Sequence, residues 1–147
     1  MRALIETCVI VDALQSRAPF RKAAEGVFLA AANRRFDGFL SAKSVADIYY
    51  LTHRATHSGS ETRKLLGKLF TLFDLLDTTG MDCRRALSSD IADYEDAVMA
   101  ESALRGGMDC IVTRNLKDYK AWPVRAVSPE EFLESIAIAP EEQPEKR

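Results

Sequence analysis

The sequence predicts an α/β protein with a parallel sheet covered by helices on both faces. Short apolar runs rich in β-branched residues, typical of buried strands, alternate along the chain with longer segments of helical periodicity. The clearest unit lies between Asp93 and Tyr119. Asp93 can cap a helix, the glycine pair at 106–107 can end it in a left-handed turn, and the apolar run at 110–112 predicts the strand that follows.

The other elements are predicted by proline or serine near helix starts, apolar stripes at helical spacing, and glycine or serine at breaks. The apolar residues between 65 and 73 are expected in the core. Besides the strand at 110–112, we expect strands over 2–6, 38–40, 73–77 and 124–127. We expect helices to begin near Asp12 and Pro19, after the caps at 41–44 and after a break at 58–60. A short helix over 83–87 and a closing helix from Ser128 complete the prediction.

Length and composition restrict the class of protein. A chain of 147 residues, 47% hydrophobic and 29% charged, is typical of one soluble domain, which we place at residues 1–139 with a disordered tail at 140–147. The net charge of −2 argues against a uniformly basic nucleic-acid-binding surface. Three cysteines lack Cys-x-x-Cys spacing, and no apolar run approaches the ~20 residues that cross a bilayer, so we expect a cytoplasmic protein outside the membrane.

Four acids are candidates for a catalytic site. Glu6 ends the first strand, Asp96 lies in the first turn of the helix that Asp93 caps, and Asp118 lies just beyond the strand that follows. Asp47 lies in an otherwise apolar helical segment, where an unpaired charge is costly. Ligands of open α/β sheets bind at the carboxyl ends of the strands, and clustered carboxylates suit Mg²⁺ or Mn²⁺. Each acid also has a simpler interpretation, because first-turn acids complement the helix dipole and Asp47 can lie on a helix surface.

Basic residues gather between residues 53 and 68, where Glu61 alone opposes them. As a group they can hold phosphates along a groove, whereas a solvated charged face explains any one of them. The candidates for phosphate contact are Arg54, His57, Arg63, Lys64 and, after the strand at 110–112, Arg114.

Several stretches resemble the PIN-domain nucleases, in particular the VapC-type toxin ribonucleases. The matching stretches are residues 4–14, 44–50, 94–97, 109–119 and 128–133. Each is short, but the ordered set is specific and covers nearly the whole chain.

The resemblance implies a three-layer α/β/α fold with a four- to five-stranded parallel sheet. It also implies an endoribonuclease, a hydrolase that uses one or two Mg²⁺ or Mn²⁺ ions to cut RNA, with an antitoxin protein and a second copy of the chain as expected partners. The catalytic residues are then Glu6, Asp47, Asp96 and Asp118. The metal ligands are Glu6, Asp96, Asp118 and Asn115, supported by Thr113 and Asp93.

Three positions depart from the family pattern. The family normally has Asp where this chain has Glu6, commonly Glu where it has Asp47, and in many relatives Asp where it has Asn115. The extra methylene of Glu6 moves its carboxylate by about 1.5 Å, and an amide gives a metal only a neutral oxygen. We therefore interpret Asp118 as the fourth charged group, carried by a helical turn that Asn115 caps.

Two other readings compete with the nuclease. In the first, the altered acids no longer assemble a metal site, and the fold binds RNA or a protein partner. The second is a phospho-accepting receiver domain, but only Glu6 follows the first strand and no Lys follows residues 124–127, so we discount it.

Overall fold

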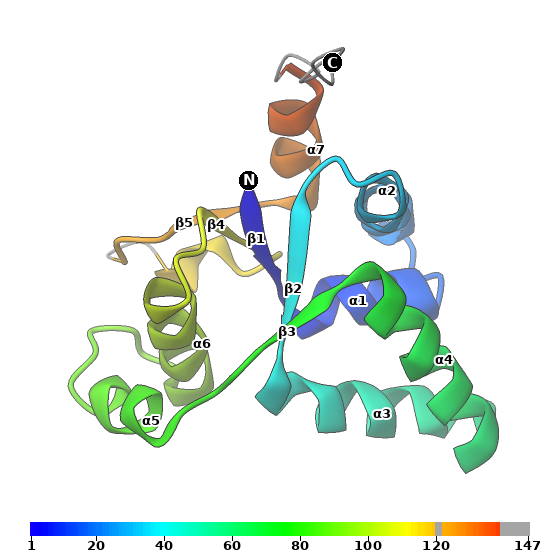
Figure 1. Ribbon diagram of the computed structural model, residues 1–147, viewed down its shortest axis with the longest axis horizontal. Coiled ribbons are helices and arrows are strands. Elements are labelled where there is room, and N and C mark those ends of the chain that lie inside the picture. The colour runs from blue at the N-terminus through cyan, green and yellow to red at the C-terminus, as the bar shows by residue number, and fades with distance from the viewer. Residues whose placement is uncertain (120–121, 139–147) are drawn as a thin grey trace, which may run out of the picture.

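The fold is a five-stranded parallel sheet with helices on both faces (Figure 1), as the sequence predicts. The computed structural model describes residues 1–119 and 122–138. The strands are β1 Arg2–Ile5, β2 Asp37–Ser41, β3 Asp74–Leu76, β4 Cys110–Val112 and β5 Arg125–Val127, in the spatial order β3-β2-β1-β4-β5. Each neighbouring pair is parallel, with Leu4 opposite Phe39 on one side and Ile111 on the other.

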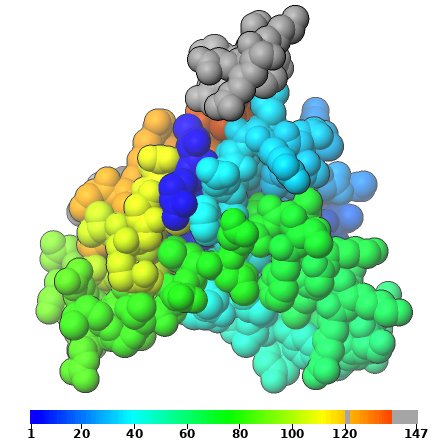
Figure 2. Space-filling view, in the orientation of Figure 1, coloured from blue at the N-terminus to red at the C-terminus, as the bar shows by residue number. Residues whose placement is uncertain are grey.

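The helices connect these strands. They are α1 Thr7–Leu14, α2 Arg21–Ala32, α3 Ala42–Thr56, α4 Gly59–Leu72, α5 Gly80–Ala86, α6 Tyr94–Arg105, the 3-10 turn η1 Leu116–Tyr119, and α7 Pro129–Ile138. In the space-filling view, α3 and α4 fill one lower corner of the molecule and α5 the other (Figure 2). In the described part of the chain, no helix has both the length and the apolar character needed to span a membrane.

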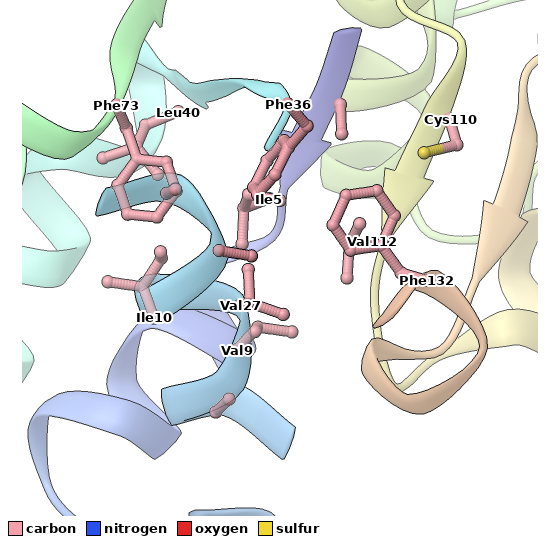
Figure 3. Close-up of a cluster of buried hydrophobic side chains, with 14 of the residues drawn as sticks. Ile5, Val9, Ile10, Val27, Phe36, Leu40, Phe73, Cys110, Val112 and Phe132 are labelled. Atoms are coloured by element: carbon pink, nitrogen blue, oxygen red, sulfur yellow. The ribbon is translucent and has the colours of Figure 1, made fainter. Parts of the chain in front are cut away.

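Two hydrophobic clusters lie on opposite faces of the sheet, because successive strand residues point to opposite sides. Ile5 and Val112 face one cluster, and Leu4 and Ile111 face the other. Figure 3 shows Ile5 among the rings of the first cluster. Those rings are Phe36, Phe73 and Phe132, which come from the chain before β2, the end of α4 and α7.

Some boundaries differ from the prediction. α1 begins at Thr7, because the carbonyl of Glu6 accepts hydrogen bonds from the backbone of the next turn, and residues 9–11 form the buried face of that helix. A short apolar run does not distinguish strand from buried helix. The expected core residue Phe70 is 41% exposed, because α4 turns that position to solvent. The predicted disordered tail at 140–147 lies outside the described residues.

The carboxyl edge of the sheet continues its hydrogen bonding one residue past the strands. The amide of Glu6 donates to the carbonyl of Val112 at 3.0 Å, and the amide of Thr113 donates to the carbonyl of Val127 at 3.0 Å. Glu6 and Thr113 are thereby held side by side at the place where α1 and the loop to η1 begin.

Candidate functional site

A hollow of about 580 Å³ lies at this carboxyl edge, between α1, α3, α6 and η1. Its acidic lining residues are Glu6, Asp93, Glu95, Asp96 and Asp118. They come from segments far apart in the sequence, and the parallel topology brings them together because it places the ends of neighbouring strands at one edge.

Glu6 is the buried acid of the hollow, with only 8% of its surface exposed. Its Oε2 accepts a short hydrogen bond from the hydroxyl of Thr113 and a weaker contact from the thiol of Cys8 at 3.6 Å. Its Oε1 accepts from the hydroxyl of Tyr119 at 3.2 Å. Buried carboxylates need such donors, and here both oxygens have one.

Asp96 lies beside Glu6 in the first turn of α6. Its amide donates to the side chain of Asp93 at 2.9 Å, so Asp93 caps the helix as the sequence predicts. Burial, followed by the negative charges of Glu6 and Asp93, raises the pKa of Asp96 to about 7. Burial and the neighbouring carboxylates together therefore favour a proton on Asp96.

Tyr119 joins the two acids. Its hydroxyl lies 3.2 Å from Oε1 of Glu6 and 3.3 Å from Oδ1 of Asp96, and its side chain is almost completely buried. Burial and the two neighbouring carboxylates raise the pKa of this phenol, so it remains a hydrogen-bond donor. One phenolic hydrogen thus serves two acceptors.

Asn115 and Asp118 line the same hollow. The amide of Asp118 donates to the backbone carbonyl of Asn115 at 3.2 Å, so the expected helical turn forms. The hydroxyl of Thr113 accepts from the amide of Asn115 at 2.9 Å, and the expected cap by the Asn115 side chain stays a prediction. Thr113 therefore connects the turn to Glu6.

Comparison with known proteins identifies the family. Residues 2–117 match the PIN domain. The chain is a PIN-domain protein. No curated protein matches it.

Solved structures similar to this PIN domain support the fold. A toxin–antitoxin complex from Klebsiella pneumoniae contains a chain that is 19% identical, with a TM-score of 0.65, over 86% of this chain and 97% of that one. VapBC2 from Rickettsia felis, bound to a DNA fragment from its promoter, contains a chain that is 17% identical, with a TM-score of 0.59, over 87% of this chain and 98% of that one.

The structure does not bring Asp47 into the hollow of this PIN domain. Asp47 is exposed and lines a neighbouring hollow of about 370 Å³ with Lys43, whose ammonium pairs with Glu95 at 2.6 Å. The reason is the direction in which each position of α3 points. Positions 43 and 47 are four residues apart and lie on the same side of the helix, whereas Ser44 lies on the side that faces the acids.

The predicted phosphate-contacting residues divide into two groups. Arg54, His57, Arg63 and Lys64 are exposed on α3, α4 and the turn between them, outside the lining of the hollow. Arg114 is partly buried: its guanidinium pairs with buried Asp12 at 2.7 Å and lies over the Phe20 ring, 4.0 Å from the centroid. Arg114 therefore contributes an ion pair to the fold, and its contact with phosphate stays a prediction.

Several residues that line or bridge the hollow of this PIN domain were not predicted, and Tyr119 and Arg17 show why. Tyr119 had a usable signal, because it follows Asp118 in a turn expected to face the acids. Arg17 had none, because its place in the hollow depends on how α1 ends.

The residues of this PIN domain fit Mg²⁺ or Mn²⁺ in their chemistry, because the hollow is lined by carboxylates and an amide oxygen, which are hard ligands. The side chains of these candidate ligands lie farther apart than the ligands of an assembled metal site. Among residues 1–119 and 122–138, no three His, Cys, Asp or Glu side chains converge closely enough to hold an ion. A cation bound by Glu6 and Asp96 together would take over a position that the Tyr119 hydroxyl now serves.

Proposed function

We propose that this PIN-domain protein is a Mg²⁺- or Mn²⁺-dependent endoribonuclease, acting in the cytoplasm as the toxin of a toxin–antitoxin pair. The observation that carries the proposal is the concentration of negative charge in one hollow, where repulsion by Glu6 and Asp93 adds to burial in raising the pKa of Asp96 to about 7. A divalent cation relieves such repulsion, and metal-assisted phosphodiester hydrolysis uses carboxylates of this kind.

The roles follow from position. Glu6, Asp96 and Asp118 would hold the ion, and Asn115 would add a neutral oxygen. When bound, the ion supplies polarisation of the scissile phosphate and a lower pKa for the attacking water. Thr113 orients Glu6, and Asp93 fixes the first turn of the helix that carries Asp96. Asp47 has no part in this set, because it lines the neighbouring hollow.

The antitoxin part of the proposal is supported by the proteins whose solved structures are similar to this one. One of the two structures named above is a toxin–antitoxin complex and the other is VapBC2. An antitoxin protein is therefore a partner we expect, and a second copy of this chain is a further partner that only the family resemblance suggests.

The test is cleavage of generic RNA by purified protein with Mn²⁺, Mg²⁺ or EDTA. We expect cleavage with either ion and none with the chelator. Asp96→Asn should reduce the rate about 100-fold or more, because it removes a ligand charge. The control is Asp37→Asn, at an exposed acid where β2 begins, at the opposite edge of the sheet. Equal cleavage by Asp96→Asn and the parent would assign the activity to a contaminant.

A second function, RNA binding without cleavage, is favoured by one observation. Without a cation, Glu6 and Asp96 already share the hydroxyl of Tyr119 as a hydrogen-bond donor. A protein that binds RNA in EDTA and leaves it intact with Mn²⁺ and Mg²⁺ would support this function over the nuclease.

A further inference from the structure

Arg17 stands out among the residues that line the acidic hollow. It is the one basic side chain in that lining within the described chain, and it reaches the hollow from the end of α1. Ser16 has a left-handed φ of 52°, and the amide of Arg17 donates back to the carbonyl of Asp12 at 3.0 Å. This hydrogen-bonded reversal is the turn that ends many helices, and it directs Arg17 back along α1.

Gln15 holds the guanidinium of Arg17 in place. Its side-chain oxygen accepts from Nε of Arg17 at 3.2 Å and from Nη2 at 2.9 Å. Its side-chain nitrogen donates to the carbonyl of Leu51 in α3 at 2.9 Å. The guanidinium is thus oriented by an amide that is itself anchored to a second helix.

Among the described residues, Arg17 forms no ion pair with an acid in this arrangement. Gln15 is neutral, whereas the other two cations near the hollow have acid partners: Lys43 pairs with Glu95, and Arg114 pairs with Asp12. A guanidinium has five N–H donors, and Gln15 takes two of them, so three remain for a ligand. An oriented guanidinium with free donors is suited to phosphate.

We infer that Arg17 binds a backbone phosphate of RNA at the rim of the hollow and that Gln15 is its positioning residue. This inference rests on the proposed function for its substrate class, but it concerns binding and is independent of cleavage. A phosphate on Arg17 would place the neighbouring phosphodiester bond over the acids, which by themselves repel the RNA backbone.

The experiment measures RNA binding in a protein that cannot cut. Labelled single-stranded RNA is titrated by fluorescence anisotropy against Asp96→Asn protein in EDTA, across a series of salt concentrations. In this background Arg17→Met should weaken binding about tenfold at low salt and reduce the magnitude of the salt slope by about 0.7, because one phosphate contact is lost. Gln15→Glu should weaken binding similarly, because its carboxylate would neutralise Arg17.

The matched control is Arg21→Met. Arg21 is exposed nearby in sequence, but it is paired with Glu25 at 2.8 Å and lies outside the lining of the hollow. Circular dichroism of each variant shows that it is folded. Equal affinity and equal salt slope for Arg17→Met and Arg21→Met would overturn the inference, as would a failure of the Asp96→Asn protein to bind RNA at all. Arg17-dependent binding without metal-dependent cleavage in the parent would uphold it and reject the nuclease.

Discussion

Tyr119 lies between two carboxylates that compete for its single hydrogen. Its hydroxyl is 3.2 Å from Glu6 and 3.3 Å from Asp96, and its ring belongs to the cluster on the α6 face of the sheet. The length of Glu6 matters here, because its carboxylate meets Tyr119 on one oxygen and Thr113 on the other. The Glu6 side chain is therefore matched to its neighbours, although the family normally has the shorter Asp.

We predict that Tyr119→Phe binds Mn²⁺ several-fold more tightly than the parent. The variant keeps the buried ring but removes the hydroxyl that now serves both acids, so an entering cation displaces no hydrogen bond. It should also lose about 1 kcal/mol of stability without metal, because one buried and one partly buried acceptor lose a donor. Calorimetric titration and denaturant unfolding measure the two effects.

Tyr94→Phe is the control for this change, because its hydroxyl donates to the carbonyl of Cys83 at 2.9 Å and Tyr94 does not line the acidic hollow. Weaker Mn²⁺ binding by Tyr119→Phe would show that the hydroxyl orients the acids for the ion and does not compete with it.

The end of α1 and the loop after β4 are fastened to each other by a buried ion pair. Asp12 has 1% of its side chain exposed, and its partner Arg114 has 29%, with the guanidinium stacked over Phe20. The pair holds the loop that carries Asn115 against α1. An acid as deeply buried as Asp12 depends on this partner, because an unpaired buried charge is costly.

We predict that Arg114→Met destabilises the protein by about 3 kcal/mol, because Asp12 is left charged and unpaired. Adding Asp12→Asn to this variant should restore part of the loss, which a double-mutant cycle by urea unfolding measures. Arg21→Met, which breaks an exposed ion pair with Glu25, should cost under about 0.5 kcal/mol. A loss that small for Arg114→Met would mean that Asp12 finds water or another donor.

Two acids with opposite pKa shifts make the stability of the molecule depend on pH. Burial alone would raise the pKa of Asp82, but hydrogen bonds from Arg105, Thr79 and Ser102 outweigh burial and lower it to about 2. Asp82 thereby links α5 to α6. The pKa of Asp96 is raised to about 7 by burial and by its negative neighbours.

We predict that the metal-free protein is most stable near pH 4 to 5. The lowered pKa of Asp82 stabilises the fold above its ordinary value of 3.8, and this contribution is lost as the pH falls toward 2. The raised pKa of Asp96 means that the folded state binds more protons than the unfolded state between pH 3.8 and about 7, so stability falls as the pH rises through that range. Thermal unfolding in EDTA from pH 2 to 8 tests both the acid limb of the stability curve, below the maximum, and its upper limb, above the maximum.

A different variant tests each limb of the stability curve. Asp96→Asn should raise the melting temperature at pH 8 by a few degrees and flatten the upper limb, whereas Asp82→Asn should lower it at pH 5 and flatten the acid limb. Asp37→Asn serves again as the control. An upper limb unchanged in Asp96→Asn would assign that limb to another group.

The sequence alone predicts the succession of strands and helices along the chain and the positions of Glu6, Asp96 and Asp118 near one sheet edge. These follow from local rules, because apolar periodicity defines the elements and parallel strands bring their carboxyl ends to the same side. The start of α1 was missed because a short apolar run is the same pattern in a strand and in a buried helix.

Which side chains share the hollow depends on the packing of the elements in three dimensions. The rotation of α3 about its axis sends Asp47 to a neighbouring hollow and Ser44 to the acids, and no pattern within the helix sets that rotation relative to the sheet. Tyr119 meets Asp96 across 23 positions and Glu6 across 113, and Gln15 meets Leu51 across 36. Such contacts depend on how the elements pack together, which is a property of the whole fold and not of any one segment.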